Sequence, residues 1–136
     1  MSEVIYDVDS SQLLRAADSA ALTATTTLDA VEFDMSAGGN FAVAIHVSAI
    51  TTTATDEVYT FTVQGADAAG ANGADLYTLA GVSAVGEYLI PVNARTAAKI
   101  LGEAGCKTTA LKLTVAGVAP SVTFAAWISP IHANAM

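Results

Sequence analysis

The sequence predicts an all-β protein, and three observations support this prediction. Several segments alternate apolar and polar residues with the period of two that is typical of β-strands. Clusters of glycine, asparagine and proline separate these segments at short intervals, as turns do. Helical patterns are few and short, so no helical layer is expected. Together these features predict about eight short strands in a single chain.

The four clearest strands are expected at residues 41–48, 59–63, 111–115 and 122–128. Each places its larger apolar side chains on one face and its smaller or polar side chains on the other. In the first and the last of these strands the second face is also mostly apolar. That composition favours a central position in a sheet or a contact within an oligomer.

Weaker strand patterns occur at residues 4–8, 28–33, 75–79 and 88–92. One short helix is expected at residues 95–101, because Asn93 lies near its N-cap and Gly102 occupies its C′ position. A helical turn is also expected at residues 11–17. Neither helical segment is long enough to cover a sheet.

The length of 136 residues fits a single domain, so residues 1–136 are expected to form one unit. Residues 1–27 are weakly patterned and are interpreted as an extended N-terminal arm. A single flat sheet would leave one apolar face in water, so a two-sheet sandwich or a barrel is expected. A jelly-roll sandwich is favoured over an immunoglobulin-like one, because Cys106 is the only cysteine and the usual disulfide is impossible.

The composition favours packing against a partner. Only 13% of the residues are charged, against roughly 25% in an ordinary soluble domain. Abundant small side chains lose little conformational freedom when another molecule docks on them. The net charge is −8, and the five basic residues are spread along the chain without forming a stripe. Nucleic acid is therefore not an expected partner.

A membrane partner is not expected either. Residues 35–55 and 113–136 lack charged side chains, but neither segment suits a transmembrane helix. The first contains two glycines and an asparagine, and the second is interrupted by Pro120 and Pro130. Residues 1–9 carry three acidic residues and no basic one, which is unlike a signal peptide. The single cysteine, Cys106, fits synthesis in a reducing cytoplasm.

The search for catalytic or metal-binding residues gives mostly negative results. His46 and His132 are the only histidines, and they are far apart in the sequence. Asp67, Asn72 and Asp75 bracket a glycine-rich loop that offers fewer oxygens than calcium requires. A solvated turn is the favoured interpretation of that loop, with a calcium site as the alternative. No catalytic residue, cofactor site or metal site is predicted, and no enzymatic activity is expected.

Three stretches of the chain carry a resemblance to a known family. They are residues 9–14 followed by 20–25, residues 56–61, and residues 121–129. In order and spacing, across nearly the whole chain, the sequence resembles the phage capsid cement, or decoration, proteins of the Bordetella phage jelly-roll family. Residues 15–18 depart from the usual pattern of that family, which leaves open how the N-terminal arm docks.

The resemblance implies a structural virion protein on the outer capsid surface. Such proteins bind the assembled head and tie neighbouring major capsid subunits together, and they usually form small homo-oligomers, dimers or trimers. The N-terminal arm is expected to supply part of the capsid or oligomer contact, and edge strands are expected to pair between subunits. Five apolar residues are candidates for an interface: Leu13, Leu14, Leu22, Trp127 and Ile131.

Two other classes of protein are compatible with an all-β chain. A carbohydrate- or receptor-binding module of a phage fibre or a secreted protein would expose several aromatic side chains on one face. Here only Trp127 and four tyrosines are available for that purpose. An enzyme of cupin type would need clustered histidines and a carboxylate, and the two histidines are far apart.

Overall fold

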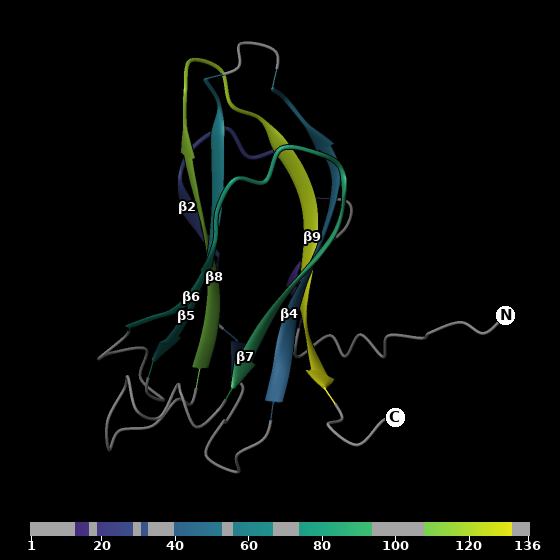
Figure 1. Cartoon of the computed structure of the whole chain (residues 1–136), viewed down its shortest axis with the longest axis vertical. Coiled ribbons are helices and arrows are strands. Elements are labelled where there is room, and N and C mark those ends of the chain that lie inside the picture. Colours follow the sequence, from purple (N-terminus) through teal and green to yellow (C-terminus); the bar gives the residue numbers. More distant parts are fainter. Residues whose placement is uncertain are drawn as a thin grey trace, which may run out of the picture.

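A computed structural model of the chain describes residues 13–16, 19–28, 31–32, 40–52, 56–66, 74–93 and 108–131. These residues form nine strands in two antiparallel sheets that face each other (Figure 1), and they contain no helix. Sheet A has the order β1 (Leu13–Arg15), β9 (Val122–Ile131), β4 (Asn40–Ile50) and β7 (Gly86–Asn93). Sheet B has the order β2 (Thr26–Thr27), β8 (Thr108–Ala116), β5 (Val58–Ala66) and β6 (Ala74–Leu79).

The ninth strand, β3 (Val31–Glu32), lies on the same side of β8 as β2 does. Thr27 in β2 is opposite Lys112, and Val31 in β3 is opposite Thr109. Between the two strands the Leu28 amide donates a hydrogen bond of 2.9 Å to the carbonyl of Leu111. The two short strands therefore follow each other along one edge, so each sheet has four strand positions.

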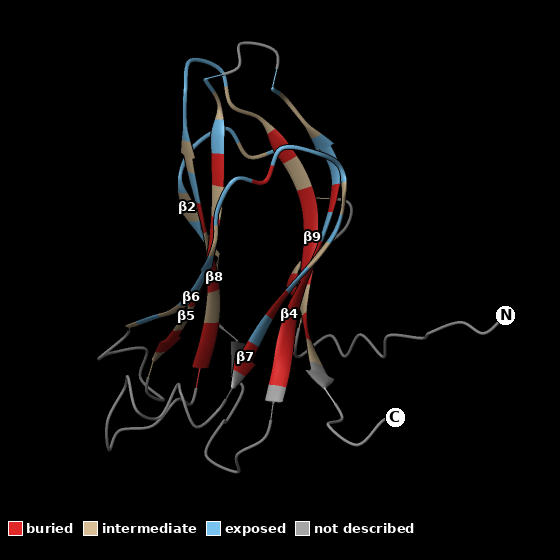
Figure 2. Ribbon diagram, in the orientation of Figure 1, coloured by how far each residue is buried: buried red, intermediate tan, exposed pale blue. Residues whose placement is uncertain are grey.

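One hydrophobic core joins the two sheets, because the larger side chains of each alternating strand turn inward. Figure 2 shows that buried residues are concentrated in the long strands of both sheets. The twelve largest fully buried side chains come from β4, β5, β7, β8 and β9: Tyr59, Phe61, Phe124, Ile45, Ile90, Leu111, Leu113, Ile128, Val43, Val47, Val63 and Val122.

The structure confirms the four clearest strands as parts of β4, β5, β8 and β9, and two weaker ones as β6 and β7. β4 and β9 are the central strands of sheet A, in agreement with their two apolar faces. The helical turn predicted at 11–17 is wrong where the structure describes it, since Leu13–Arg15 is strand β1. Pairing with β9 overrides the weak local helical pattern there. The helix expected at 95–101 and the strand expected at 4–8 lie outside the described residues.

The described part of the expected arm runs along the sandwich from sheet A to sheet B. β1 pairs with β9, and Leu22 exchanges two backbone hydrogen bonds, of 2.9 and 3.0 Å, with Val122. The Arg15 guanidinium lies 5.0 Å from the ring centroid of Phe124 and donates a hydrogen bond to the carbonyl of Ala20. Partial burial lowers the pKa of Arg15 through desolvation, but a guanidinium stays charged at neutral pH.

Candidate interaction surfaces

Sheet A turns an apolar face to solvent. In each of its long strands the residues that alternate with the core positions point outward. The strand register aligns four of these outward residues in a row across the whole sheet: Leu13, Trp127, Ala44 and Leu89. We call the outward side of this sheet the sheet A face; its described residues in the three central rows are Leu13, Ala42, Ala44, His46, Glu87, Leu89, Pro91, Ala125, Trp127 and Ser129.

The middle strand of the sheet A face carries small side chains with little exposed surface. Ala42 and Ala44 in β4 keep only 2% and 4% of their surface exposed, although they point outward. Trp127 of β9 flanks Ala44 on one side, and Leu89 of β7, which is 60% exposed, flanks it on the other.

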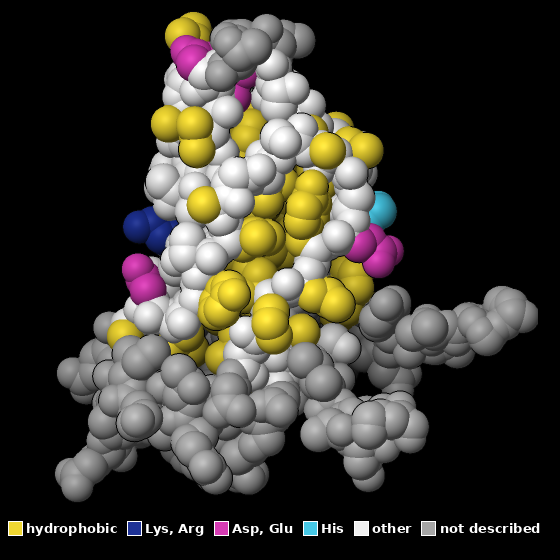
Figure 3. Space-filling view, in the orientation of Figure 1, with side chains coloured by type: hydrophobic (Ala, Val, Ile, Leu, Met, Phe, Trp, Pro, Cys, Tyr) yellow, Lys and Arg dark blue, Asp and Glu magenta, His cyan; other side chains and the backbone are white. Residues whose placement is uncertain are grey.

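One ion pair borders this apolar row. His46 Nδ1 in β4 lies 4.0 Å from Glu87 Oε2 in β7, and both side chains are largely exposed. In Figure 3 the histidine and acidic side chains project from the outline of the molecule on the sheet A side. No local sequence pattern pairs these residues, because β4 and β7 are joined only by the long-range sheet register. For the same reason, Leu89 was not among the predicted interface residues.

The opposite face of the sandwich has a different character. Threonines, together with Lys112, Gln64 and Asp75, form the outward side of sheet B, as the register of β5, β6 and β8 shows. Gln64 Nε2 donates a hydrogen bond of 2.8 Å to Asp75 Oδ1, and the hydroxyl oxygens of Thr62 and Thr78 lie 3.5 Å apart. This face is suited to contact with water, so the two faces differ clearly in polarity.

Exposed apolar side chains also occur at one end of the sandwich. There the chain passes between the sheets through residues 80–85 and 117–121, and β5 begins (Figure 1). Three of the five large exposed hydrophobic side chains of the described residues belong to this end: Val118 at 83%, Val85 at 60% and Val58 at 49%. We call this surface the loop end.

The loop end is held in place from inside the core. Tyr59 is fully buried, and its hydroxyl lies 2.5 Å from the carbonyl oxygen of Thr51 and accepts a hydrogen bond of 3.0 Å from the Ser121 amide. Gly117 has a φ of +109°, and a Cβ there would come within 2.8 Å of the Asp56 carbonyl oxygen. The Tyr59 hydroxyl therefore holds the backbone at Thr51 and Ser121 against β5.

The five candidate interface residues are divided between the core and the sheet A face. Leu13 and Trp127 are opposite each other in β1 and β9 and are both partly exposed. Leu14 is 7% exposed and belongs to the core, and Leu22 packs against it. The backbone of Ile131 pairs with Asn40 at the end of β9, and the structure describes the backbone of Ile131 but not its side chain.

The residues considered for metal binding and catalysis are dispersed. Within the described ranges no group of three or more His, Cys, Asp or Glu side chains could hold a metal ion. Asp75 is hydrogen-bonded in β6, whereas Asp67, Asn72, Cys106 and His132 lie outside the described residues. The described part of the chain contains no helix that could cross a membrane.

Comparison with known protein families, with curated proteins and with solved structures found no match to this chain. Its function must therefore be argued from its own surfaces. The sheet A face and the loop end offer exposed hydrophobic area on fixed backbone, which is what a binding surface requires.

Proposed function

We propose that this chain is a structural virion protein without enzymatic activity. In this role it binds the outer surface of a phage head after synthesis in the host cytoplasm, and it stabilises contacts between major capsid subunits. The proposal combines the sequence resemblance to capsid cement proteins with the strand order, which is the observation that carries it. Neither cofactor nor metal has a part in this function.

The strand order supports a jelly-roll fold. A jelly roll forms when a long antiparallel hairpin of eight strand positions wraps into two sheets, so that the first strand pairs with the last, the second with the seventh, and so on. With β2 and β3 counted as one position, the pairs here are β1 with β9, β2 and β3 with β8, β4 with β7, and β5 with β6. These four pairs follow that wrapping order, and the resemblance independently implies the same fold.

The loop end is the surface that we propose for the capsid contact. Val118, Val58 and Val85 offer exposed apolar contacts there. The hydrogen bonds of Tyr59 hold the backbone at Thr51 and Ser121 before binding, which reduces the conformational entropy lost on docking. Small exposed valines add hydrophobic area without long side chains that would have to be ordered.

Binding to undecorated, expanded phage heads tests the proposal. We expect purified protein to co-sediment with the heads, to saturate at a fixed number of copies per capsid subunit, and to raise the melting temperature of the heads. Val118→Asp should weaken binding at least about tenfold, because it places a carboxylate in an apolar contact. Tyr77→Ala, on the exposed edge strand β6, is the matched control and should bind as the wild type does. A wild-type protein that stays in the supernatant would contradict the proposal.

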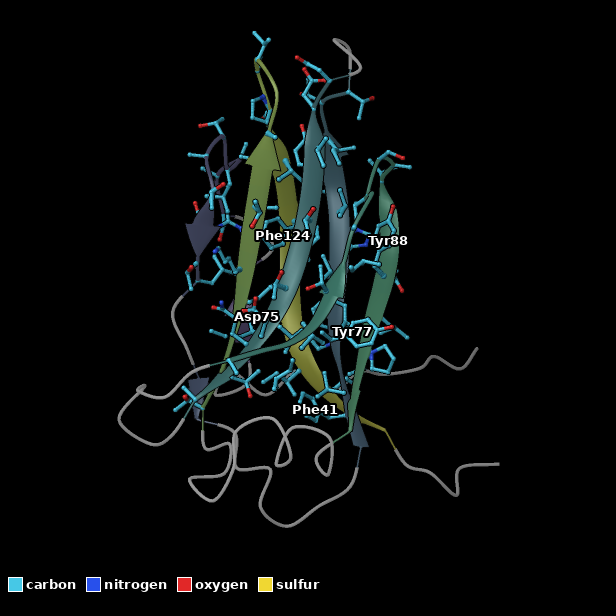
Figure 4. All side chains as sticks on the ribbon, turned by 60° about the vertical axis from the view of Figure 1, so that its left-hand side comes forward. Phe41, Asp75, Tyr77, Tyr88 and Phe124 are labelled. Atoms are coloured by element: carbon cyan, nitrogen blue, oxygen red, sulfur yellow. The ribbon has the colours of Figure 1, made fainter. Side chains whose placement is uncertain are left out.

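A carbohydrate- or receptor-binding module is the alternative function. One observation favours it: Tyr77 is 49% exposed on the edge strand β6, which also carries the hydrogen-bonded Asp75 (Figure 4). An exposed aromatic ring offers a flat apolar surface on which a sugar ring can stack. Binding on a glycan array that Tyr77→Ala abolishes, without binding to heads, would establish this alternative.

A further inference from the structure

We infer that the free edge of β7 is a docking site for an extended, basic peptide segment of another protein, which adds to sheet A as a further strand. β6 and β7 end their sheets on the same side of the sandwich and contact each other there. We call this side the open flank; it consists of Tyr77 and Leu79 of β6, Tyr88 of β7 and the outer edge of β7. The loop-end valines are not part of it, so the inference holds whether or not the chain binds a phage head.

The open flank leaves inward-facing side chains of sheet B partly uncovered. Residues directly opposite each other in antiparallel strands point to the same face of the sheet. Tyr77 lies opposite Val63, which is completely buried in the core, yet Tyr77 keeps 49% of its surface exposed. Leu79 lies opposite the buried Phe61 and is only partly buried. These side chains reach water because neither sheet has a further strand on this side among the described residues.

β7 contributes the other border of the open flank. Tyr88 lies opposite the buried Ile45 and is only partly buried, and its hydroxyl donates a hydrogen bond of 2.6 Å to the carbonyl of Ala84. Figure 4 shows Tyr77 and Tyr88 on the two strands that border this side. Figure 3 shows hydrophobic side chains gathered between the two sheets. The flank therefore offers apolar contacts from both sheets to a segment that lies along it.

The backbone of β7 offers hydrogen-bonding groups along the same side. Pro91 lies opposite Ala42 within the β4–β7 ladder, and a proline fits into a sheet where its nitrogen faces an open edge. Backbone groups alternate between the two sides of a strand, so the N–H and C=O groups of Glu87 and Leu89 face this open edge too. Outside the ladder, no hydrogen bond of these groups to a described residue is found. An added strand along residues 86–90 would pair with them, which is how extended peptides bind exposed sheet edges.

β7 is the most suitable of the described edge strands for such an addition. It has eight residues and pairs with β4 without an irregularity in the register. β1 has three residues and an irregular register, and β2 and β3 have two residues each. β6 has an irregularity in its pairing with β5 next to Asp75. Short or irregular edges are poor templates for a new strand, so β7 is the edge at which a partner pairs.

Charge specifies a basic partner. Residues 74–93 carry two carboxylates, Asp75 and Glu87, and no basic side chain. The Glu87 side chain is 66% exposed, and His46 lies 4.0 Å from it on the β4 side only. A strand added to β7 places one of its residues directly opposite Glu87, where Lys or Arg is favourable. The net charge of −8 likewise favours a basic segment over a second copy of this chain.

The same register predicts a pattern for the partner. The residue next to the basic one lies opposite Tyr88 and faces inward, over the open flank. An apolar side chain there is buried against Tyr88 and Tyr77, which gains hydrophobic stabilisation. The expected segment therefore combines a basic outward residue with apolar residues at the alternate, inward positions.

Selection of binders from a displayed library of random peptides tests the inference. We expect the enriched peptides to show the predicted pattern, with binding measured by isothermal titration calorimetry. Leu89→Pro removes an N–H from the open edge, so it should raise the dissociation constant at least about tenfold. Leu89→Thr keeps that N–H and should stay within about threefold of the wild type. Tyr77→Ala should also weaken binding, and circular dichroism with thermal unfolding checks that each variant folds.

Hydrogen exchange of the wild-type protein gives an independent readout. Peptide binding should slow the exchange of the Glu87 and Leu89 amides, because they become paired with the added strand. Dissociation constants weaker than about 1 mM for all selected peptides would overturn the inference, and so would affinity that Leu89→Pro leaves intact. Enriched peptides that match strands of this chain would assign the edge to a second copy and overturn it as well.

Discussion

The rings of Phe61 in β5 and Phe124 in β9 meet edge to face between the two sheets, with centroids 5.0 Å apart and planes at 80°. Both side chains are almost completely buried, and Figure 4 shows Phe124 within the sandwich. The Arg15 guanidinium of β1 lies 5.0 Å from the centroid of the same Phe124 ring. Phe124 thus connects sheet B, its own sheet and the start of the described chain.

Replacement of this pair should reveal a coupling between the sheets. Phe124→Leu should lower the free energy of unfolding by about 1–2 kcal/mol, through lost burial and a small cavity. A double-mutant cycle with Phe61→Leu should give a coupling of about 1 kcal/mol. Each single substitution already removes the edge-to-face contact, so the double variant loses no further energy from it. Urea denaturation measures all four proteins. The losses of stability caused by Phe124→Leu and Tyr77→Leu should simply add. A coupling of about 1 kcal/mol between these two changes would show that the Phe61–Phe124 coupling does not report the contact of their rings.

Tyr59→Phe should destabilise the protein although it removes a single oxygen atom. The change leaves the Ser121 amide and the Thr51 carbonyl without the hydroxyl between them, which costs about 1–3 kcal/mol. Chemical denaturation should show this loss, and hydrogen exchange at Ser121 should become faster. In the control Tyr77→Phe, where the side chain is 49% exposed, stability should stay within about 0.5 kcal/mol of the wild type.

Gly117→Ala should be more harmful than Gly81→Ala, although both glycines have positive φ angles. At Gly81, with φ of +75°, an added Cβ would meet no atom within 4 Å, so the cost is the backbone strain of about 1–2 kcal/mol. At Gly117 the Cβ would also come within 2.8 Å of the Asp56 carbonyl oxygen and the Glu57 Cα. We expect its loss of stability, measured by thermal unfolding, to exceed that of Gly81→Ala by at least about 1 kcal/mol. Equal losses would show that the close approach is unimportant.

Thr109→Val should stabilise the protein. Thr109 is fully buried, and its Oγ1 has no hydrogen-bond partner among the described residues. A methyl group of similar shape removes the cost of that buried hydroxyl, so the free energy of unfolding should rise by about 1 kcal/mol. Thr114→Val, on the exposed side of the same strand, should change stability by less than about 0.5 kcal/mol. If Thr109→Val destabilises the protein, the Thr109 hydroxyl has a hydrogen-bond partner in solution.

The strand content was predictable because the period of two is a local property. The alternation in 41–48 and 122–128 follows from the pleat of a single strand and needs no knowledge of its neighbours. The same alternation placed Trp127 on the side opposite Phe124, as the register of β9 confirms. Weak local patterns were less informative, and Leu13–Arg15 became a strand against a helical expectation.

The candidate surfaces depended on contacts between distant segments. Glu87 joins His46, and Leu89 joins Trp127, only because β7 and β9 both pair with β4. Tyr59 reaches Ser121 across 62 positions of the sequence. No local periodicity specifies such partners, since many strand orders bury the same alternating faces equally well.

The sequence by itself therefore determined the fold class, the positions of the long strands and the side of each strand that enters the core. Those properties follow from the pleat and from the burial of apolar side chains, which act within one segment. The tertiary structure alone decided the strand order, the row from Leu13 to Leu89 and the fixed loop end. Those features arise from backbone pairing and close packing between segments that are far apart in the chain.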